Sequence, residues 1–313
     1  QLDGLTFTSV TGYVDYEIDE LCDCDFTGAE VFNATRDEKY SQFSQEFRFA
    51  SELGNTIDYI GGLFYQKNDL DYADTISLTN PTVITTALNL KGATTLSPLA
   101  AGASTERKFD QDGDIWAIFS QATWNIADDL RLTAGGRYTK ESKDASRSQQ
   151  HRASYGGQLL PAVAPAGATA QLAQTIAGYN ALFGVFAVEP YDKLSGKDTD
   201  ESFTPLVSVQ WDKDDQTMLY ATWTQGYKSG GFDARSNGHP DASTNNAENP
   251  LKVAAGVDGS IKGSWEFNPE EVNGYELGSK MVLADGAAEL NLALYRIEYE
   301  DLQVSQFDGT LGF

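Results

Sequence analysis

The chain has 313 residues, of which 41% are hydrophobic and 12% aromatic, and its formal net charge is −24. Negative charge of this size disfavours binding to nucleic acid and suits a secreted or cell-surface protein. No run of about 18 apolar residues occurs, which excludes a transmembrane helix. The sequence opens on strand-like residues without a signal peptide, so we expect a processed chain or a fragment.

About nine stretches have the composition and the alternation of β-strands. In LRLTAGGRYTKE, apolar or small residues at Leu130, Leu132 and Tyr138 alternate with polar residues such as Arg131 and Arg137. This period of two indicates a strand and not a helix, because side chains alternate between the two faces of a strand. The predicted strands are Leu5–Ile18, Ser41–Ser51, Thr56–Asp71, Asp114–Asn125, Leu130–Ser142, Ser202–Trp211, Gln216–Lys228, Glu270–Leu283 and Ala287–Val304.

The gaps between these strands alternate between short and long. The short gaps ELGN, IADD, DKDD and ADG are rich in the residues that tight hairpins need. In an up-and-down meander, strict alternation places every long loop at one end, as in barrels with short periplasmic turns and long extracellular loops. The long gaps are Asp19–Tyr40, Tyr72–Gly113, Lys143–Glu201, where Ala162–Val188 predicts a loop with a short helix, and Ser229–Pro269.

The two faces of the predicted strands differ in polarity. Phe203, Val207 and Trp211 lie opposite Thr204 and Ser208. In a transmembrane barrel the apolar face meets lipid and the polar face lines the lumen. The alternative is a soluble β-sandwich, whose apolar face would cover a core. In LNLALYRIEY the apolar face switches after the leucines, which indicates either a bulge or the point where the strand leaves the bilayer.

Catalytic and metal-binding motifs are missing from the sequence. The two histidines fall in predicted loops, and no zinc motif, nucleophile elbow or phosphate-binding loop occurs, so we expect no enzyme, metal site or cofactor. DQDGD, Asp110–Asp114, is similar to a calcium loop but lacks its glycine, which favours a solvated acidic turn. Cys22 and Cys24 predict a disulfide, with a soft-metal site or two inert thiols as the alternatives.

Several segments together resemble the barrel of TonB-dependent outer-membrane receptors. They follow one another in the order that this family shows, and they span nearly all of the chain. The segments are SQEFRFAS (Ser44–Ser51), IGGLFYQ (Ile60–Gln66), LRLTAGGRYTKESK (Leu130–Lys143), LYATWTQGYKSGGF (Leu219–Phe232), NGYELGSK (Asn273–Lys280) and LNLALYRIEYEDLQV (Leu290–Val304).

The resemblance implies an all-β fold, namely an antiparallel up-and-down transmembrane β-barrel. Plugged transporters of this kind have about 22 strands, so about nine strands would form only part of the barrel. We therefore expect residues 1–313 to be a piece of the barrel domain. The N-terminal plug domain with its TonB-contacting box, and the last strands, are absent from this chain.

The resemblance also implies active uptake of a scarce nutrient across the outer membrane of a Gram-negative bacterium. A ferric siderophore is the expected ligand, and an oligosaccharide or another metal chelate is the alternative. Expected partners are outer-membrane lipid and a TonB-type energy-coupling protein, which acts through the missing plug. A passive porin or a surface adhesin would share the alternation and the loop asymmetry, but a porin needs an open lumen.

Candidate site residues follow from the faces and from the predicted extracellular ends. One group should face the lumen, where its members either pair with the plug or simply line a wetted wall: Glu46, Arg48, Arg131, Arg137, Glu276 and Lys280. A second group lies at or beyond an extracellular strand end, where ligand capture is expected: Tyr227, Lys228, Phe232, Arg235 and His239.

Overall fold

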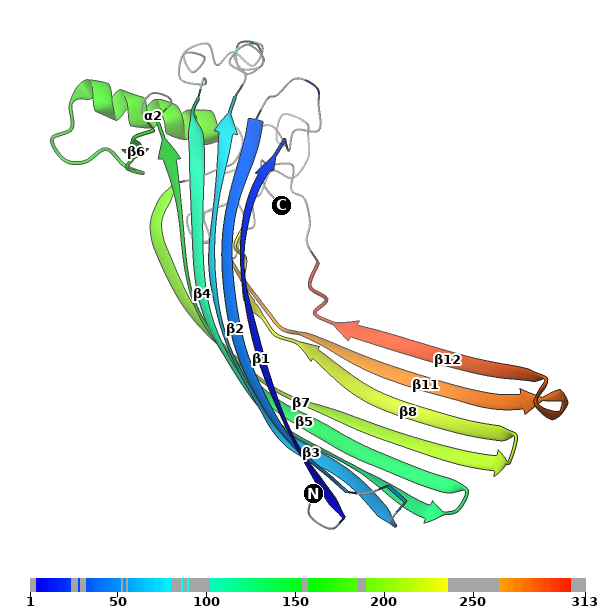
Figure 1. The fold of residues 1–313 in the computed structure, drawn as a ribbon. Helices are drawn as coiled ribbons and strands as arrows, with labels where there is room; N and C mark the ends of the chain where they lie inside the picture. Colours follow the sequence, from blue (N-terminus) through cyan, green and yellow to red (C-terminus); the bar gives the residue numbers. More distant parts are fainter. Residues whose placement is uncertain are drawn as a thin grey trace.

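Nine long strands form one antiparallel sheet in chain order, which confirms the predicted meander (Figure 1). The computed structural model describes residues 4–23, 28, 32–51, 53–54, 56–79, 86, 89, 102–153, 157–184, 190–235 and 265–304. The strands are β1 (Leu5–Cys22), β2 (Phe32–Ser51), β3 (Ile57–Leu78), β4 (Ser104–Ala127), β5 (Leu130–Arg152), β7 (Tyr191–Asp214), β8 (Thr217–Lys228), β11 (Glu270–Leu283) and β12 (Ala288–Glu300). Short strands β6 (Leu159–Leu160), β9 (Gly231–Phe232) and β10 (Glu266–Phe267) accompany them.

Tight turns join the strands at the end that the sequence predicts. Two-residue connections separate β4 from β5 and β7 from β8. The turn after β11 contains Asp285 at φ 54° and Gly286 at φ 92°, and Gly54 between β2 and β3 has φ 93°. Glycine tolerates this left-handed conformation and aspartate is enriched in it, so the ELGN and ADG sequences suit these turns.

The apolar residues gather on one face of the sheet and are exposed there, although they are hydrophobic. Leu63, Trp116 and Phe203 expose 51%, 60% and 61% of their surface. Their band ends where the rings of Tyr65 and Trp116 pack 4.3 Å apart, because the next residue of β3 on this outer face is Lys67. An apolar belt bordered by aromatic side chains is the pattern of a lipid-facing barrel wall.

The strands continue well beyond this apolar band. β3 ends at Leu78 instead of Asp71, β5 ends at Arg152 instead of Ser142, and β7 begins at Tyr191 instead of Ser202. β2 and β4 likewise begin about ten residues early. The segment Asp110–Asp114 lies within β4, so the predicted acidic turn is wrong. These extensions form the tall part of the sheet in Figure 1, and water on their outer face removes the apolar signal.

Helix α2 (Ala170–Gly184) lies beside the far end of the extended strands, within the loop for which a helix was predicted (Figure 1). Thr169 caps its start, because the Leu172 amide donates to the Thr169 hydroxyl at 3.3 Å. Its Phe183 ring is buried and stacks on His151 of β5, with 4.4 Å between the ring centroids. None of the helices in the described part of the chain has the length and hydropathy of a membrane-crossing helix.

The register of strand β12 explains why its apolar face changes after Leu294. It pairs with β11 residue by residue from Ala288 to Glu300, without a register shift, so the switch is not a bulge. The outer face of β12 carries Leu290, Leu292 and Leu294, and then Arg296 and Glu298. The change therefore marks the point where the strand leaves the apolar band.

Candidate functional site

A short segment after β8 folds across one face of the extended strands. We call residues Ser229–Arg235 the inner segment, and the face that it covers the inner face. Lys143 of β5 donates to the Ser229 hydroxyl at 2.7 Å and also to the Gly230 carbonyl. The Gly230 amide donates to the Asp200 carboxylate of β7 at 2.8 Å. The segment is thus fixed to the wall at its first two residues.

An aromatic side chain anchors the middle of the inner segment. Phe232 is 6% exposed and packs in a cluster with Tyr72, Phe109, Ala145 and Trp265. Its ring lies 4.6 Å from that of Trp265, centroid to centroid. A Cβ atom on Gly196 of β7 would come within 2.5 Å of the Phe232 ring, so the close approach requires glycine there.

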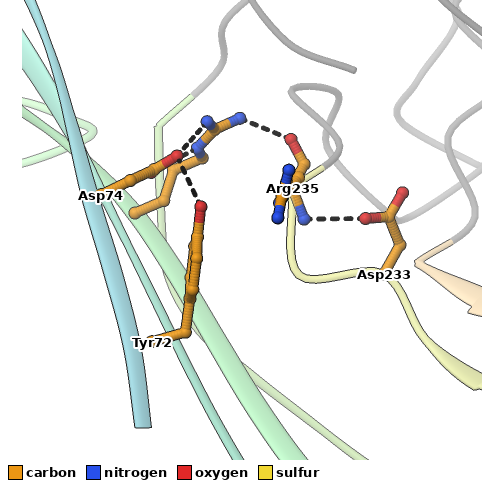
Figure 2. Close-up of polar contacts among 5 residues, drawn as sticks. Tyr72, Asp74, Asp233 and Arg235 are labelled. Atoms are coloured by element: carbon orange, nitrogen blue, oxygen red, sulfur yellow. Dashed lines mark hydrogen bonds and ion pairs between the residues drawn. The ribbon is translucent and has the colours of Figure 1, made fainter. Parts of the chain in front are cut away.

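Two buried arginines hold the end of the inner segment. Arg107 of β4 is 4% exposed, forms a bidentate ion pair with Asp74, and donates to the Arg235 carbonyl. Figure 2 shows Tyr72 turned toward Asp74, to which its hydroxyl donates at 3.2 Å. Arg147 of β5 donates to the Asp233 carbonyl at 3.0 Å. Each arginine thus donates one N–H group to a backbone carbonyl of the inner segment.

Burial shifts the protonation equilibria of these groups. Burial, reinforced by the charge of Asp74, raises the pKa of Tyr72 to about 12, so the phenol stays protonated and can donate. Burial lowers the pKa of Arg147, and the nearby Arg107 adds to this effect. Arg147 also lies 5.7 Å from the Tyr191 ring centroid, and Arg235 lies 5.8 Å from that of Tyr72. The inner face of the extended strands thus combines cationic and aromatic groups.

The structure brings together some of the residues that were predicted to capture ligand. Phe232 and Arg235 lie in the inner segment, and Tyr227 lies near the end of β8, two residues before that segment. Lys228 is exposed, and His239 lies outside the described residues. Whether any of them contacts ligand stays a prediction.

Sequence reasoning missed the residues of the wall itself. Tyr72, Arg107 and Arg147 fall in stretches that were predicted to be loops. A signal was present, because the buried residues Ala145, Arg147, Gln149 and His151 alternate with half-buried polar residues such as Ser146 and Ser148. Without an apolar face, that alternation did not indicate a strand.

The residues predicted to face the lumen share the inner face. In the register, Glu46 lies opposite Phe64, which is on the same face of β3 as Tyr72. Most of them have a partner within the wall: Arg48 with Glu46, Arg131 with Asp212, Arg137 with Thr139, and Glu276 with Tyr220. Lys280 is exposed, and contact with a plug stays a prediction for all six.

The remaining predicted sites concern cysteines and metals. Cys22 is the last residue of β1, whereas Cys24 lies outside the described residues, so their disulfide stays a prediction. Within the described part of the chain, no three His, Cys, Asp or Glu side chains are placed to hold a metal ion.

Comparison with solved structures relates this wall to known receptors. The fold matches the ferric yersiniabactin uptake receptor FyuA of Yersinia pestis with a TM-score of 0.63 at 16% identity, covering 97% of this chain and 35% of that one. It matches the siderophore receptor PiuA of Acinetobacter baumannii with a TM-score of 0.53 at 13% identity, covering 94% and 37%. This chain thus spans little more than a third of either protein.

A family comparison covers the sequence from end to end. No curated protein matches the sequence significantly. The profile of the family described as TonB dependent receptor-like, beta-barrel matches residues 2–313. This family resides in the outer membrane of Gram-negative bacteria, in agreement with the apolar outer band. The chain therefore belongs to the TonB-dependent receptor-like β-barrel family.

Proposed function

We propose that this chain is part of a receptor that imports a ferric siderophore across the outer membrane, with energy coupled through TonB. The observation that carries the proposal is the inner wall above the apolar band, where Arg107, Arg147 and Arg235 gather among aromatic rings. The chain as a whole has a charge of −24, whereas this group holds three arginines, of which Arg107 is paired with Asp74. Guanidinium groups bind anionic oxygen atoms strongly, and ferric siderophores carry such atoms.

The domain arrangement is also a proposal. In the described residues, β1 and β12 each pair with only one neighbour, so the sheet path does not close. Exposed sheet edges are not tolerated in the hydrocarbon region, because their backbone groups would lack hydrogen-bond partners. We infer that residues 1–313 are one part of the barrel domain, that further strands complete it, and that a plug fills it and contacts TonB. The two similar proteins, a ferric yersiniabactin uptake receptor and a siderophore receptor, support the same ligand class.

Uptake by cells tests the proposal directly. Cells that express the full-length receptor as their only siderophore receptor should accumulate radioactive iron from a panel of ferric siderophores, and should lose this uptake when TonB is deleted. Uptake that persists without TonB, with large steady conductance in planar bilayers, would instead support a porin. Uptake of labelled oligosaccharides without iron uptake would move the ligand class to sugars.

A pair of variants connects uptake to the wall. Replacing Arg147 with Gln should raise the concentration needed for half-maximal uptake, because a buried cation on the inner face is lost. Lys197→Gln is the matched control, because it also removes one positive charge. Lys197 is exposed on the outer face, where it is paired with Asp144. Equal effects of the two substitutions would contradict a role of the inner wall in ligand capture.

A further inference from the structure

A small cavity lies directly below the inner segment, at the level where the apolar band ends. Its volume is about 310 Å³, and its lining includes Phe64, Arg137, Glu141, Tyr227 and Ser229. β8 pairs with β7 only up to Thr224 and then stays paired with β11 alone, so its last residues can face β5. Ser229 begins the inner segment, which therefore borders this cavity.

Arg137 is the charged group of the cavity that the wall does not neutralise. Its Nε donates to the Thr139 hydroxyl at 3.0 Å, and no carboxylate of the described residues forms an ion pair with it. Glu141, the other charged residue of the lining, is paired with Lys143 at 2.9 Å. The lining thus keeps one positive charge, whose remaining N–H groups are available to an acceptor.

Aromatic rings surround this guanidinium group. Its carbon lies 5.2 Å from the ring centroid of Phe64 and 5.8 Å from that of Phe119. The hydroxyl oxygen of Tyr227 is buried and has no hydrogen-bond partner in the described residues. Burial, together with the charge of Asp200, raises the pKa of Tyr227, so its phenol remains a donor. The cavity therefore offers the planar cation of Arg137 with its free N–H groups, the hydroxyl donor of Tyr227 and flat apolar ring surfaces.

We propose that this cavity is an inner binding pocket for one arm of the ligand, namely an aryl group that carries an anionic oxygen atom. Arg137 binds the oxygen, the Phe64 ring packs against the aryl ring, and Tyr227 donates a second hydrogen bond. The cavity is at the lower end of the usual range for ligand pockets, so it suits one arm and not a whole chelate. This inference rests on the proposed siderophore uptake and narrows its substrate class.

Three iron complexes of different chemistry test the proposal on the purified full-length receptor. The probes are ferric 2,3-dihydroxybenzoate, which is aryl and anionic, ferric citrate, which is anionic without a ring, and ferric acetohydroxamate, which is neutral without a ring. We expect the first to bind most tightly in calorimetry. Preferred binding of ferric citrate or ferric acetohydroxamate, or no binding of ferric 2,3-dihydroxybenzoate, would overturn the inference while leaving siderophore uptake intact. Failure of the cells described above to take up any ferric siderophore would instead remove the proposed function itself.

Substitution of Arg137 gives the second arm of the test. Arg137→Gln should weaken the binding of ferric 2,3-dihydroxybenzoate about tenfold or more, because a charge-assisted hydrogen bond is lost. Lys140→Gln is the control: Lys140 lies three residues away, on the outer face, and is paired with Glu201. Unchanged affinity in Arg137→Gln, with a lowered melting temperature, would show that Arg137 pairs with protein and would refute the pocket.

Discussion

Adjacent residues of β5 should respond very differently to the same new charge. Leu132 lies on the outer face, opposite Trp124 of β4 and Val209 of β7, and an arginine there would enter the apolar band. Such a substitution costs about 2–4 kcal/mol near the bilayer midplane. Thr133 lies on the inner face, where its hydroxyl contacts that of Thr123 at 2.9 Å. Thr133→Arg should cost only that hydrogen bond, about 1 kcal/mol.

Equilibrium unfolding of the full-length variants in phospholipid vesicles measures both free energies. We expect Leu132→Arg to be the less stable by about 1–3 kcal/mol, which is the difference between the two costs. Leu132→Trp separates lipid from a protein core, because lipid accepts the larger ring, whereas a packed core would lose about 1–3 kcal/mol to overpacking. Destabilisation by Trp at this position, with Arg at position 133 costing as much as Arg at 132, would refute the lipid-facing assignment.

Three further predictions concern the extended strands. Burial lowers the pKa of His151 to about 4, so the unfolded state binds more protons between pH 6.5 and 4. The free energy that keeps α2 packed on β5 should therefore fall by about 3 kcal/mol as the pH drops through this window. Amide protection factors in α2, corrected for the intrinsic exchange rate, should fall accordingly, and His151→Phe should remove this pH dependence; protection factors that stay constant would contradict the prediction. Asp74→Ala should leave Arg107 buried without its carboxylate, at a cost of about 3–5 kcal/mol, and should speed exchange in the inner segment; unchanged exchange would argue against the pair as its anchor. Gly196→Ala should push Phe232 off the wall, because the new Cβ would lie 2.5 Å from its ring; retained burial of the ring in a structure of the variant would contradict this.

The membrane-spanning half of the sheet was predictable because two environments act on it. Lipid on one side and a wetted lumen on the other produce a period of two, as in Leu130–Tyr138, and this period is readable without any structure. The hairpin turns were predictable for a local reason, since Gly54 and Asp285 adopt positive φ. The family assignment, made from the same segments, is confirmed by the match over residues 2–313.

The extended half was not predictable, because water contacts its outer face. Asp69 and Asp112 lie directly opposite each other there, as do Asp71 and Asp110. Burial together with the hydrogen bond to Asp112 raises the pKa of Asp69. Carboxylates in such numbers are unusual in strands and resemble a loop composition. The backbone ladder to the neighbouring strands, which sequence patterns do not reveal, keeps these residues extended.

The inner segment depends on contacts that are still more remote in the sequence. Arg107 and Arg235 are separated by 128 positions, and Lys143 and Gly230 by 87. Each contact joins a strand of the extension to a segment whose own sequence, SGGFDAR, has no regular period.

The two faces of the extended strands carry different charges, which reconciles the acidic chain with the proposed anionic ligand. Asp69, Asp71, Asp110 and Asp112 lie on the outer face, whereas Arg137 and Arg147 lie on the inner face with the pair of Arg107 and Asp74. At physiological ionic strength, charges more than about 8 Å apart in water are largely screened. We therefore expect a ligand at the inner face to respond to Arg137 and Arg147 more than to the net charge of the chain.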